Sequence, residues 1–284
     1  MKCKSFNRNL FFLMWLTALV VLIPNIVFSQ VKIKGKIIHK KDATPAAYAS
    51  VSLLNQKGGS LSDNSGNFSF YISKLKKDDT LLISSVGYQS LKMPVTAALT
   101  RSEFELKEDS KNLEAVTVRS FTTQEVRGSS SEITGYFRSW NYKRTGGEIG
   151  RIFKLPHTAY KIDKIKFKVN NRCDTCQIRL HIRKVANDYP DEELLYDSIT
   201  VSIQSLTMED NMPEFDLRPY DLTFDQSELF ISMEVLNCKK PGKEDCSFCF
   251  AGSEQGEYIY KSKSTTDWET TDDYTIYLKL FMRY

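Results

Sequence analysis

The chain has 284 residues, which is enough for two modest domains, and its 41% hydrophobic and 26% charged residues indicate packed cores rather than disorder. Its formal net charge is +4, but Lys2, Lys4 and Arg8 all lie in an N-terminal segment without acidic residues. The remainder therefore carries +4 − 3 = +1. This near-neutral balance gives no reason to expect a nucleic-acid partner.

Residues 1–29 predict a secretory signal peptide. A basic start is followed by an apolar run at Leu10–Ile23, a break at Pro24 and the small residue Ser29. The alternative is an uncleaved membrane anchor, because the segment 10–28 nearly reaches the length that spans a bilayer. We expect an exported protein of the periplasm or cell surface, with no membrane span after signal removal.

Residues 31–107 predict about seven short strands around a polar turn. Asp63 offers side-chain oxygens to nearby backbone N–H groups, and Gly66 can take the positive φ that ends such a turn. Phe68, Phe70 and Ile72 follow at the two-residue period of a half-buried strand. A second corner, at 85–88, contains Gly87. Asp63, Gly66 and Gly87 are therefore candidate structural turn residues.

The order of Gly35, Pro45, Asp63-x-x-Gly66-x-Phe68 and Val86-Gly87-Tyr88 resembles the carboxypeptidase regulatory-like domain. That family is a small transthyretin-like sandwich common in exported bacterial proteins. The resemblance implies a Greek-key β-sandwich over 31–107 and identifies a fold rather than an activity. In the family, the metallocarboxypeptidase catalytic domain is a separate, larger α/β unit, and nothing in 132–284 matches it.

Residues 108–131 are expected to form a linker with a possible extra strand. The segment 113–118 is β-prone, whereas 121–131 has neither apolar period nor bulk. The second domain is then expected to occupy residues 132–284.

This second domain shows the alternation of antiparallel strands and no convincing helical period. Ile178, Leu180 and Ile182 would face a core, while Arg179 and His181 would face water on the other side of the same sheet. The pattern predicts a second β-sandwich, antiparallel and jelly-roll-like. The fold class is thus all-β with two sandwich domains.

Five cysteines follow the leader, and they are candidates for disulfide bonds because export brings oxidising conditions. They are Cys173, Cys176, Cys238, Cys246 and Cys249. The odd number allows at most two bridges and one unpaired thiol, with connectivity left open. Two alternatives remain. The two C-x-x-C pairs could bind zinc through four thiolates, or serve a thioredoxin-like redox role, although neither pair precedes a helical period.

Other polar residues show no catalytic motif. His39, His157 and His181 are far apart, and Glu192-Glu193 would point to opposite faces of a strand. Asp63-x-x-Gly66 lacks the spaced oxygen ligands of a calcium loop. A triad can assemble from distant positions, so a hydrolase with a site not readable from sequence stays an alternative.

Aromatic residues of the second domain could form a platform for sugars or peptides. Strand packing is the simpler explanation for the alternating tyrosines. The candidate ligand aromatics are Trp140, Tyr258, Tyr260 and Trp268, with Tyr142 and Tyr284 as further members.

The hypothesis that follows is a non-catalytic, exported cell-envelope protein. The first domain would act as a folding and spacing module, and the second would bind an envelope protein or a glycan. No cofactor or metal is expected. A carbohydrate-binding module is the other alternative, and exposure of the aromatic residues would separate it from a scaffold.

Overall fold

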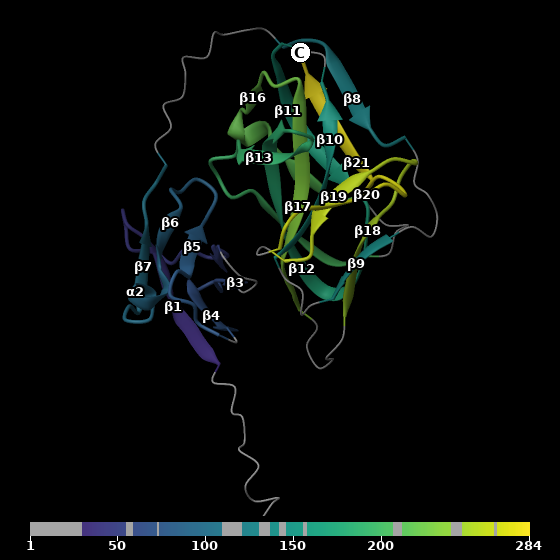
Figure 1. The fold of residues 1–284 in the computed structure, drawn as a ribbon. Helices are drawn as coiled ribbons and strands as arrows, with labels where there is room; N and C mark the ends of the chain where they lie inside the picture. Colours follow the sequence, from purple (N-terminus) through teal and green to yellow (C-terminus); the bar gives the residue numbers. More distant parts are fainter. Residues whose placement is uncertain are drawn as a thin grey trace, which may run out of the picture.

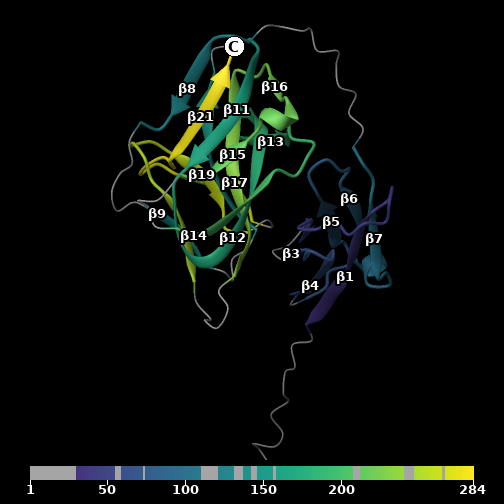
Figure 2. The ribbon, with the colours of Figure 1, turned by 180° about the vertical axis from the view of Figure 1, so that it is seen from behind.

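The computed structural model describes residues 30–54, 59–72, 74–109, 121–130, 137–141, 146–155, 158–206, 212–239, 246–263 and 266–284. The predicted signal peptide at 1–29 and the possible strand at 113–118 lie outside these residues. The described chain is almost all β and forms two sandwiches that lie side by side (Figures 1 and 2). This confirms the predicted all-β class.

In the described part of the chain, the first sandwich has seven strands in two sheets. One sheet has the order β4-β1-β7 and the other the order β3-β2-β5-β6. The strands are β1 (Val31–His39), β2 (Ser50–Leu53), β3 (Gly59–Leu61), β4 (Asn67–Ile72), β5 (Thr80–Ser84), β6 (Leu91–Pro94) and β7 (Glu103–Leu106), and a short helix α2 (Val95–Ala98) follows β6. β1 pairs antiparallel with β4 and parallel with β7.

The central turn has the geometry that its residue types favour. Asp63 Oδ1 accepts hydrogen bonds from the backbone N–H groups of Ser65 (2.9 Å) and Asn67 (2.8 Å). Gly66 has φ of 78°, and a Cβ there would lie 2.3 Å from the carbonyl oxygen of Ile37. The turn therefore requires glycine for both backbone angle and space. The turn leads directly into β4, in which the side chains of Phe68, Phe70 and Ile72 are buried in the core.

The larger sheet of the second sandwich has the order β20-β19-β10-β17-β12-β18-β9, with β13 and β14 also paired to β12. Its strands are β9 (Phe137–Asn141), β10 (Gly147–Lys154), β12 (Val169–Ala186), β13 (Tyr189–Glu193), β14 (Thr200–Leu206), β17 (Glu228–Lys239), β18 (Ser247–Ala251), β19 (Tyr258–Lys261) and β20 (Glu269–Thr271).

The facing sheet has the order β15-β11-β21-β8, with β16 paired to β11. Its strands are β8 (Gln124–Gly128), β11 (Tyr160–Phe167), β15 (Glu214–Asp216), β16 (Thr223–Phe224) and β21 (Leu278–Arg283), and a 3₁₀ turn η1 (Arg218–Tyr220) precedes β16. The strand pairings described in this sandwich are all antiparallel.

One boundary differs from the sequence-based expectation. Residues 124–128, inside the expected linker, form β8 and pair with the C-terminal strand β21. β8 is an edge strand with one neighbour, and its Val126 is exposed. An edge strand needs few apolar side chains, which is why the segment carries no apolar period. The second sandwich therefore begins before residue 132.

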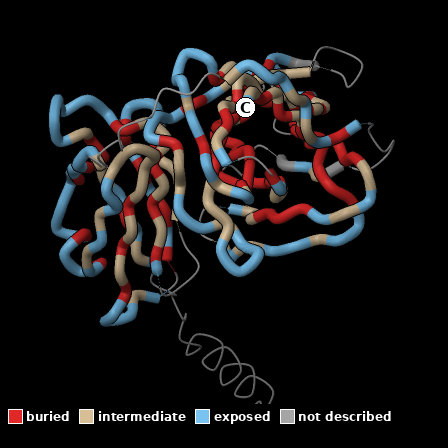
Figure 3. The backbone as a smooth tube through the Cα atoms, turned by 90° about the horizontal axis from the view of Figure 1, so that it is seen from above, coloured by how far each residue is buried: buried red, intermediate tan, exposed pale blue. Residues whose placement is uncertain are grey.

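Each sandwich has its own hydrophobic core. Buried positions run through both bodies, as the burial-coloured trace shows (Figure 3). The first core includes Ile33, Ile37 and Phe104, and the second includes Phe167, Ile178 and Leu280. Val86 of the first sandwich packs against the second core, so the two bodies are in contact. None of the helices among the described residues could cross a membrane.

Candidate functional site: a charged network facing the first sandwich

The candidate site is built on the polar face of β12. Arg179, His181 and Arg183 alternate along this strand and so project from the same side of the sheet. Arg179 and His181 are only 3% and 5% exposed. The prediction that this face meets water was therefore wrong for both residues, because neighbouring strands and the first sandwich cover it.

Three carboxylates on other strands, those of Glu148, Glu193 and Glu234, contact these cations. Glu234 on β17 lies opposite Arg179, and Glu148 on β10 lies opposite Glu234. Lys261 on β19 lies opposite Glu148, which completes a row across four strands. Sheet pairing thus juxtaposes residues that are far apart in sequence. We call Glu148, Arg179, His181, Arg183, Glu193, Ser232, Glu234 and Lys261 the charged network.

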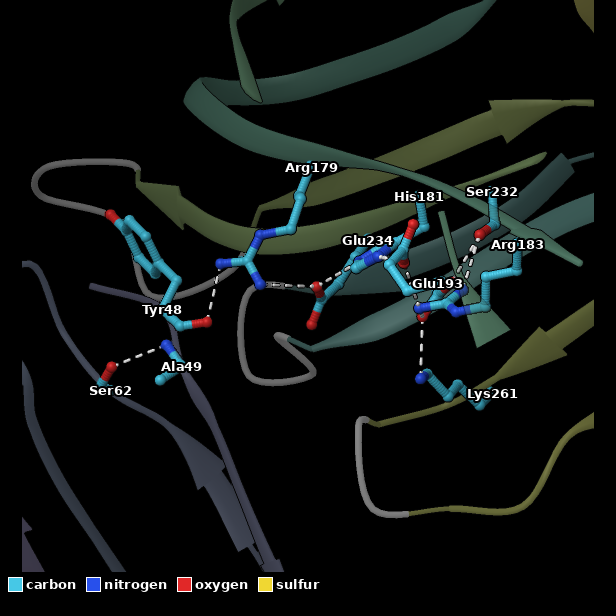
Figure 4. A network of polar contacts seen from close by, with 11 residues as sticks. Tyr48, Ala49, Ser62, Arg179, His181, Arg183, Glu193, Ser232, Glu234 and Lys261 are labelled. Atoms are coloured by element: carbon cyan, nitrogen blue, oxygen red, sulfur yellow. Dashed lines mark hydrogen bonds and ion pairs between the residues drawn. The ribbon is translucent and has the colours of Figure 1, made fainter. Parts of the chain in front are cut away.

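The contacts form a continuous chain (Figure 4). Arg179 Nη1 donates to Glu234 Oε2 at 3.4 Å, and the same oxygen lies 2.9 Å from His181 Nε2. His181 Nδ1 lies 2.7 Å from Glu193 Oε2. Arg183 Nη2 is 3.3 Å from that oxygen of Glu193 and continues the chain.

Glu148 is the second centre of the network. Arg183 Nη1 donates to its Oε1, Ser232 Oγ donates to the same oxygen at 2.5 Å, and Lys261 Nζ lies 2.9 Å from Oε2. Burial opposes ionisation of Glu148, but Arg183 and Lys261 hold its pKa well below its usual range. Glu148 is therefore a buried, ionised carboxylate whose contacts with Arg183, Ser232 and Lys261 supply positive charge and a hydroxyl donor.

His181 is placed to be an imidazolium. Each of its ring nitrogens faces a carboxylate oxygen, so both must donate for both contacts to be hydrogen bonds. Burial and Arg183 disfavour the charged ring, but Glu148 and Glu193 outweigh them and raise the pKa of His181. Burial likewise opposes ionisation of Glu193, yet His181 and Arg183 lower its pKa. Each carboxylate of the network thus contacts at least one cation, and each cation contacts at least one carboxylate.

The network reaches the first sandwich through Arg179. Its Nη2 donates to the backbone oxygen of Tyr48 at 2.8 Å (Figure 4). Tyr48 has φ of 55°, a left-handed conformation that a tyrosine adopts only when its surroundings hold it. Ser62 supplies that support, since its carbonyl oxygen accepts from Tyr48 N and its Oγ accepts from Ala49 N at 2.9 Å.

A second contact between the sandwiches is at Gly87. This residue has φ of 81°, and a Cβ would lie 2.0 Å from the carbonyl oxygen of Tyr196 in the second sandwich. The sequence marked Gly87 as a turn residue, and the structure adds that it permits close approach of the other domain. Between these contacts lies a cleft of about 340 Å³, lined by serines of β2 and β5 and by the charged network.

Among the described side chains, the candidate ligand aromatics do not form one exposed platform. Tyr258 and Tyr260 are 2% and 9% exposed, so their rings are not presented as an open platform. Trp268 lies beside the charged network, with Lys261 Nζ 4.6 Å from its ring centre and Phe230 edge-on at 5.2 Å. Trp140 is in β9, where its backbone pairs with Phe248, and its side chain lies outside the described part. Tyr142 also lies outside the described residues, and Tyr284 is 38% exposed.

The cysteines form two disulfides, Cys173–Cys246 and Cys176–Cys238. Cys249 is free. Cys173 and Cys176 therefore bond to different partners, and the bridges tie β12 to the end of β17 and to the residue before β18. Three of the four thiolates in the alternative zinc set, Cys173, Cys176 and Cys246, are thereby used in disulfides.

The remaining sequence candidates are apart from the network, and several network residues were missed. His39 packs against the ring of Tyr88 at 4.3 Å, and His157 lies outside the described residues. Glu193 joins the network while Glu192 pairs with Lys184, as opposite faces of β13 require. Glu148 and Glu234 were not singled out. Their signal is a carboxylate inside an apolar strand, which is rare without a partner.

Comparison with known proteins supports the assignment of the first sandwich. The CarboxypepD_reg-like domain family model matches residues 33–118. No curated protein matches the chain.

Two structures of the clostridial cysteine protease Cwp84 share 10% and 11% identity with the chain at TM-scores of 0.37 and 0.36. One is the protease after propeptide cleavage, and the other contains the cysteine protease and lectin-like domains of this surface-layer-associated protein of Clostridium difficile. Both alignments cover 90% of this chain but 66% and 59% of the other. A structure of infectious bursal disease virus, Gt strain, aligns at 8% identity with a TM-score of 0.28, over 90% of this chain and 64% of the other. Over residues 33–118, this chain is similar to the CarboxypepD_reg-like domain family.

Proposed function

We propose that this protein is a non-catalytic, exported component of the cell envelope that binds a partner through two β-sandwiches held as one unit. The observation that carries the proposal is the charged network. Its carboxylates and cations neutralise one another and reach across to Tyr48, so their chemistry is used in holding the sandwiches together. A binding or spacing role suits two sandwiches that are joined in this way.

The cysteines support export. Two disulfides are the usual fate of cysteines in an oxidising compartment, and the CarboxypepD_reg-like domain fits an extracellular protein. The predicted signal peptide at 1–29 agrees with this location. The periplasm and the cell surface are the two sites that we propose.

A co-sedimentation experiment tests the binding role. The purified protein is mixed with separated envelope fractions, namely peptidoglycan, membranes and surface polysaccharide, and bound protein is measured after centrifugation. Crosslinking in the native envelope with mass spectrometry then identifies the partner. We expect saturable binding to one fraction and no turnover on a panel of ester, peptide and glycoside substrates. Binding to no fraction, or turnover that Arg179→Ala abolishes, would overturn the proposal.

A further inference from the structure

A second cleft lies at the boundary of the two sandwiches and differs in charge from the first. It measures about 920 Å³ and is lined by β1, β3 and β4 together with Asn237 and Lys263 of the second sandwich. We call it the basic cleft because five cations line it: Lys32, Lys34, Lys36, Arg101 and Lys263. The three lysines of β1 alternate with buried Ile33 and Ile37 and so share one outer face.

Among the described residues, these cations have no ion-pair partner. Within the described part of the chain, no carboxylate forms an ion pair with any of the five. The acidic residue of the lining is Asp63, whose Oδ1 is already bonded to two backbone N–H groups of its turn. Glu103 lies opposite Lys36 on β7 but outside the lining. Because the chain beyond the leader is almost neutral, with a net charge of +4 − 3 = +1, the basic cleft is a local concentration of positive charge.

The same surface offers groups that recognise sugars. Ser60 lines the cleft, and its Oγ is buried without a hydrogen-bond partner among the described residues. Asn67 and Ser69 present polar side chains from β4. Tyr71, on the same outer face, is 59% exposed, and Lys32 Nζ lies 5.5 Å from its ring centre. An exposed tyrosine ring can stack on a sugar ring while nearby hydroxyl and amide groups exchange hydrogen bonds with it.

We propose that the basic cleft and the adjoining Tyr71 bind an acidic polysaccharide, a polymer whose sugar rings carry carboxylate groups. The lysines of β1 recur every second residue, about 6.7 Å apart along the strand, which suits charges that repeat along a polymer. Tyr71 and the partnerless hydroxyl of Ser60 favour a sugar backbone over an acidic peptide. This inference rests on the proposed binding role and names the class of ligand for it.

Binding of polygalacturonate to the purified protein, measured by calorimetry, tests the proposal. We expect saturable binding that weakens with added salt, since exposed charges are screened over about 10 Å at 0.1 M salt. Neutral dextran should not bind. Polyglutamate, an acidic polymer without sugar rings, should bind more weakly than polygalacturonate. Equal binding of polyglutamate and polygalacturonate would overturn the assignment to a polysaccharide.

Matched charge variants locate the site. The triple variant K32Q/K34Q/K36Q should bind polygalacturonate roughly tenfold or more weakly, because each exposed charge contact contributes modestly and three are removed together. The control K76Q/K77Q/K92Q removes the same charge from exposed lysines of the same sandwich outside the cleft and should bind as the parent does. Circular dichroism and the Tm verify that both variants fold.

Removal of the aromatic ring separates sugar recognition from simple charge attraction. Tyr71→Ala should weaken binding of polygalacturonate and leave binding of polyglutamate unchanged. Equal affinity of the two triple variants would place the site elsewhere. If polygalacturonate does not bind while an envelope fraction still does, this inference fails and the proposed binding function stands. If neither binds, both fail.

Discussion

The strands β1 and β12 have the same sequence pattern and opposite environments. In β1, Lys32 and Lys34 alternate with apolar positions and remain exposed. In β12, Arg179 and His181 alternate with apolar positions and are buried. The difference is in the neighbours, because β17 and β13, which both pair with β12, place Glu234 and Glu193 beside it. Periodicity therefore identifies the polar face of a strand, whereas the residues of adjacent strands decide whether that face can be covered.

The largest expected effect comes from removing a carboxylate of the charged network. Glu148→Ala removes the buried carboxylate that both Arg183 and Lys261 contact, which leaves Lys261 without an ion pair among the described residues and Arg183 with Glu193 alone. Breaking a buried ion pair in this way costs about 3–5 kcal/mol of the free energy of unfolding. Urea unfolding monitored by tryptophan fluorescence measures it, since all three tryptophans follow the first sandwich or lie in the leader. A cost below about 1 kcal/mol would show that the network is not buried as described.

The turn before β4 gives the next effect and tests the first sandwich by itself. Gly66→Val should cost roughly 1–3 kcal/mol, because a β-branched residue at φ of 78° is strained and its Cβ would meet the Ile37 carbonyl. Ser69→Ala, at an exposed position of β4, is the control and should be near neutral. Melting temperatures of the two variants that equal that of the parent would contradict this account of the turn.

A change of pH is expected to alter the free energy of unfolding by a smaller amount. The folded pKa of His181 is raised above its unfolded value of about 6.5, so its stabilisation is fully present below that pH. It is lost as the pH rises through the folded pKa. The pKa values of Glu148, Glu193 and Glu234 are lowered, so their contribution is present above about pH 4.5 and is lost as the pH falls through the folded values.

Urea unfolding measured from acid to alkaline pH checks the direction of these changes in stability. The free energy of unfolding should decline above neutral pH in the parent, and His181→Gln should remove that decline. His39→Gln is the control, because His39 is outside the charged network. A decline that survives in His181→Gln would assign the titration to another group.

The smallest effect concerns β1. Lys34→Ala removes an exposed charge without an ion pair among the described residues and should change the free energy of unfolding by no more than about 0.5 kcal/mol. Together with Glu148→Ala, this variant tests whether the polar face of β1 is exposed while that of β12 is buried. A cost comparable to that of Glu148→Ala would mean that β1 also has a covered polar face.

The features that could be predicted from the sequence are local ones. The turn at Asp63 and Gly66 depends on a few adjacent residues, and the core positions of β4 follow from its alternation. The charged network depends on register between strands that are distant in sequence, such as Glu148 beside Glu234. The edge strand at 124–128 was missed because an edge strand can form with little apolar content. The cysteine pairing likewise depends on where β12 and β17 meet.

Small-angle X-ray scattering tests whether the first sandwich covers the polar face of β12 in solution. The parent should give a profile that fits the two docked sandwiches. Gly87→Trp should give a larger radius of gyration, because its side chain occupies the space of the Tyr196 backbone. We expect a clear difference between the radii of gyration of the two proteins. A parent profile as extended as that of Gly87→Trp would contradict it.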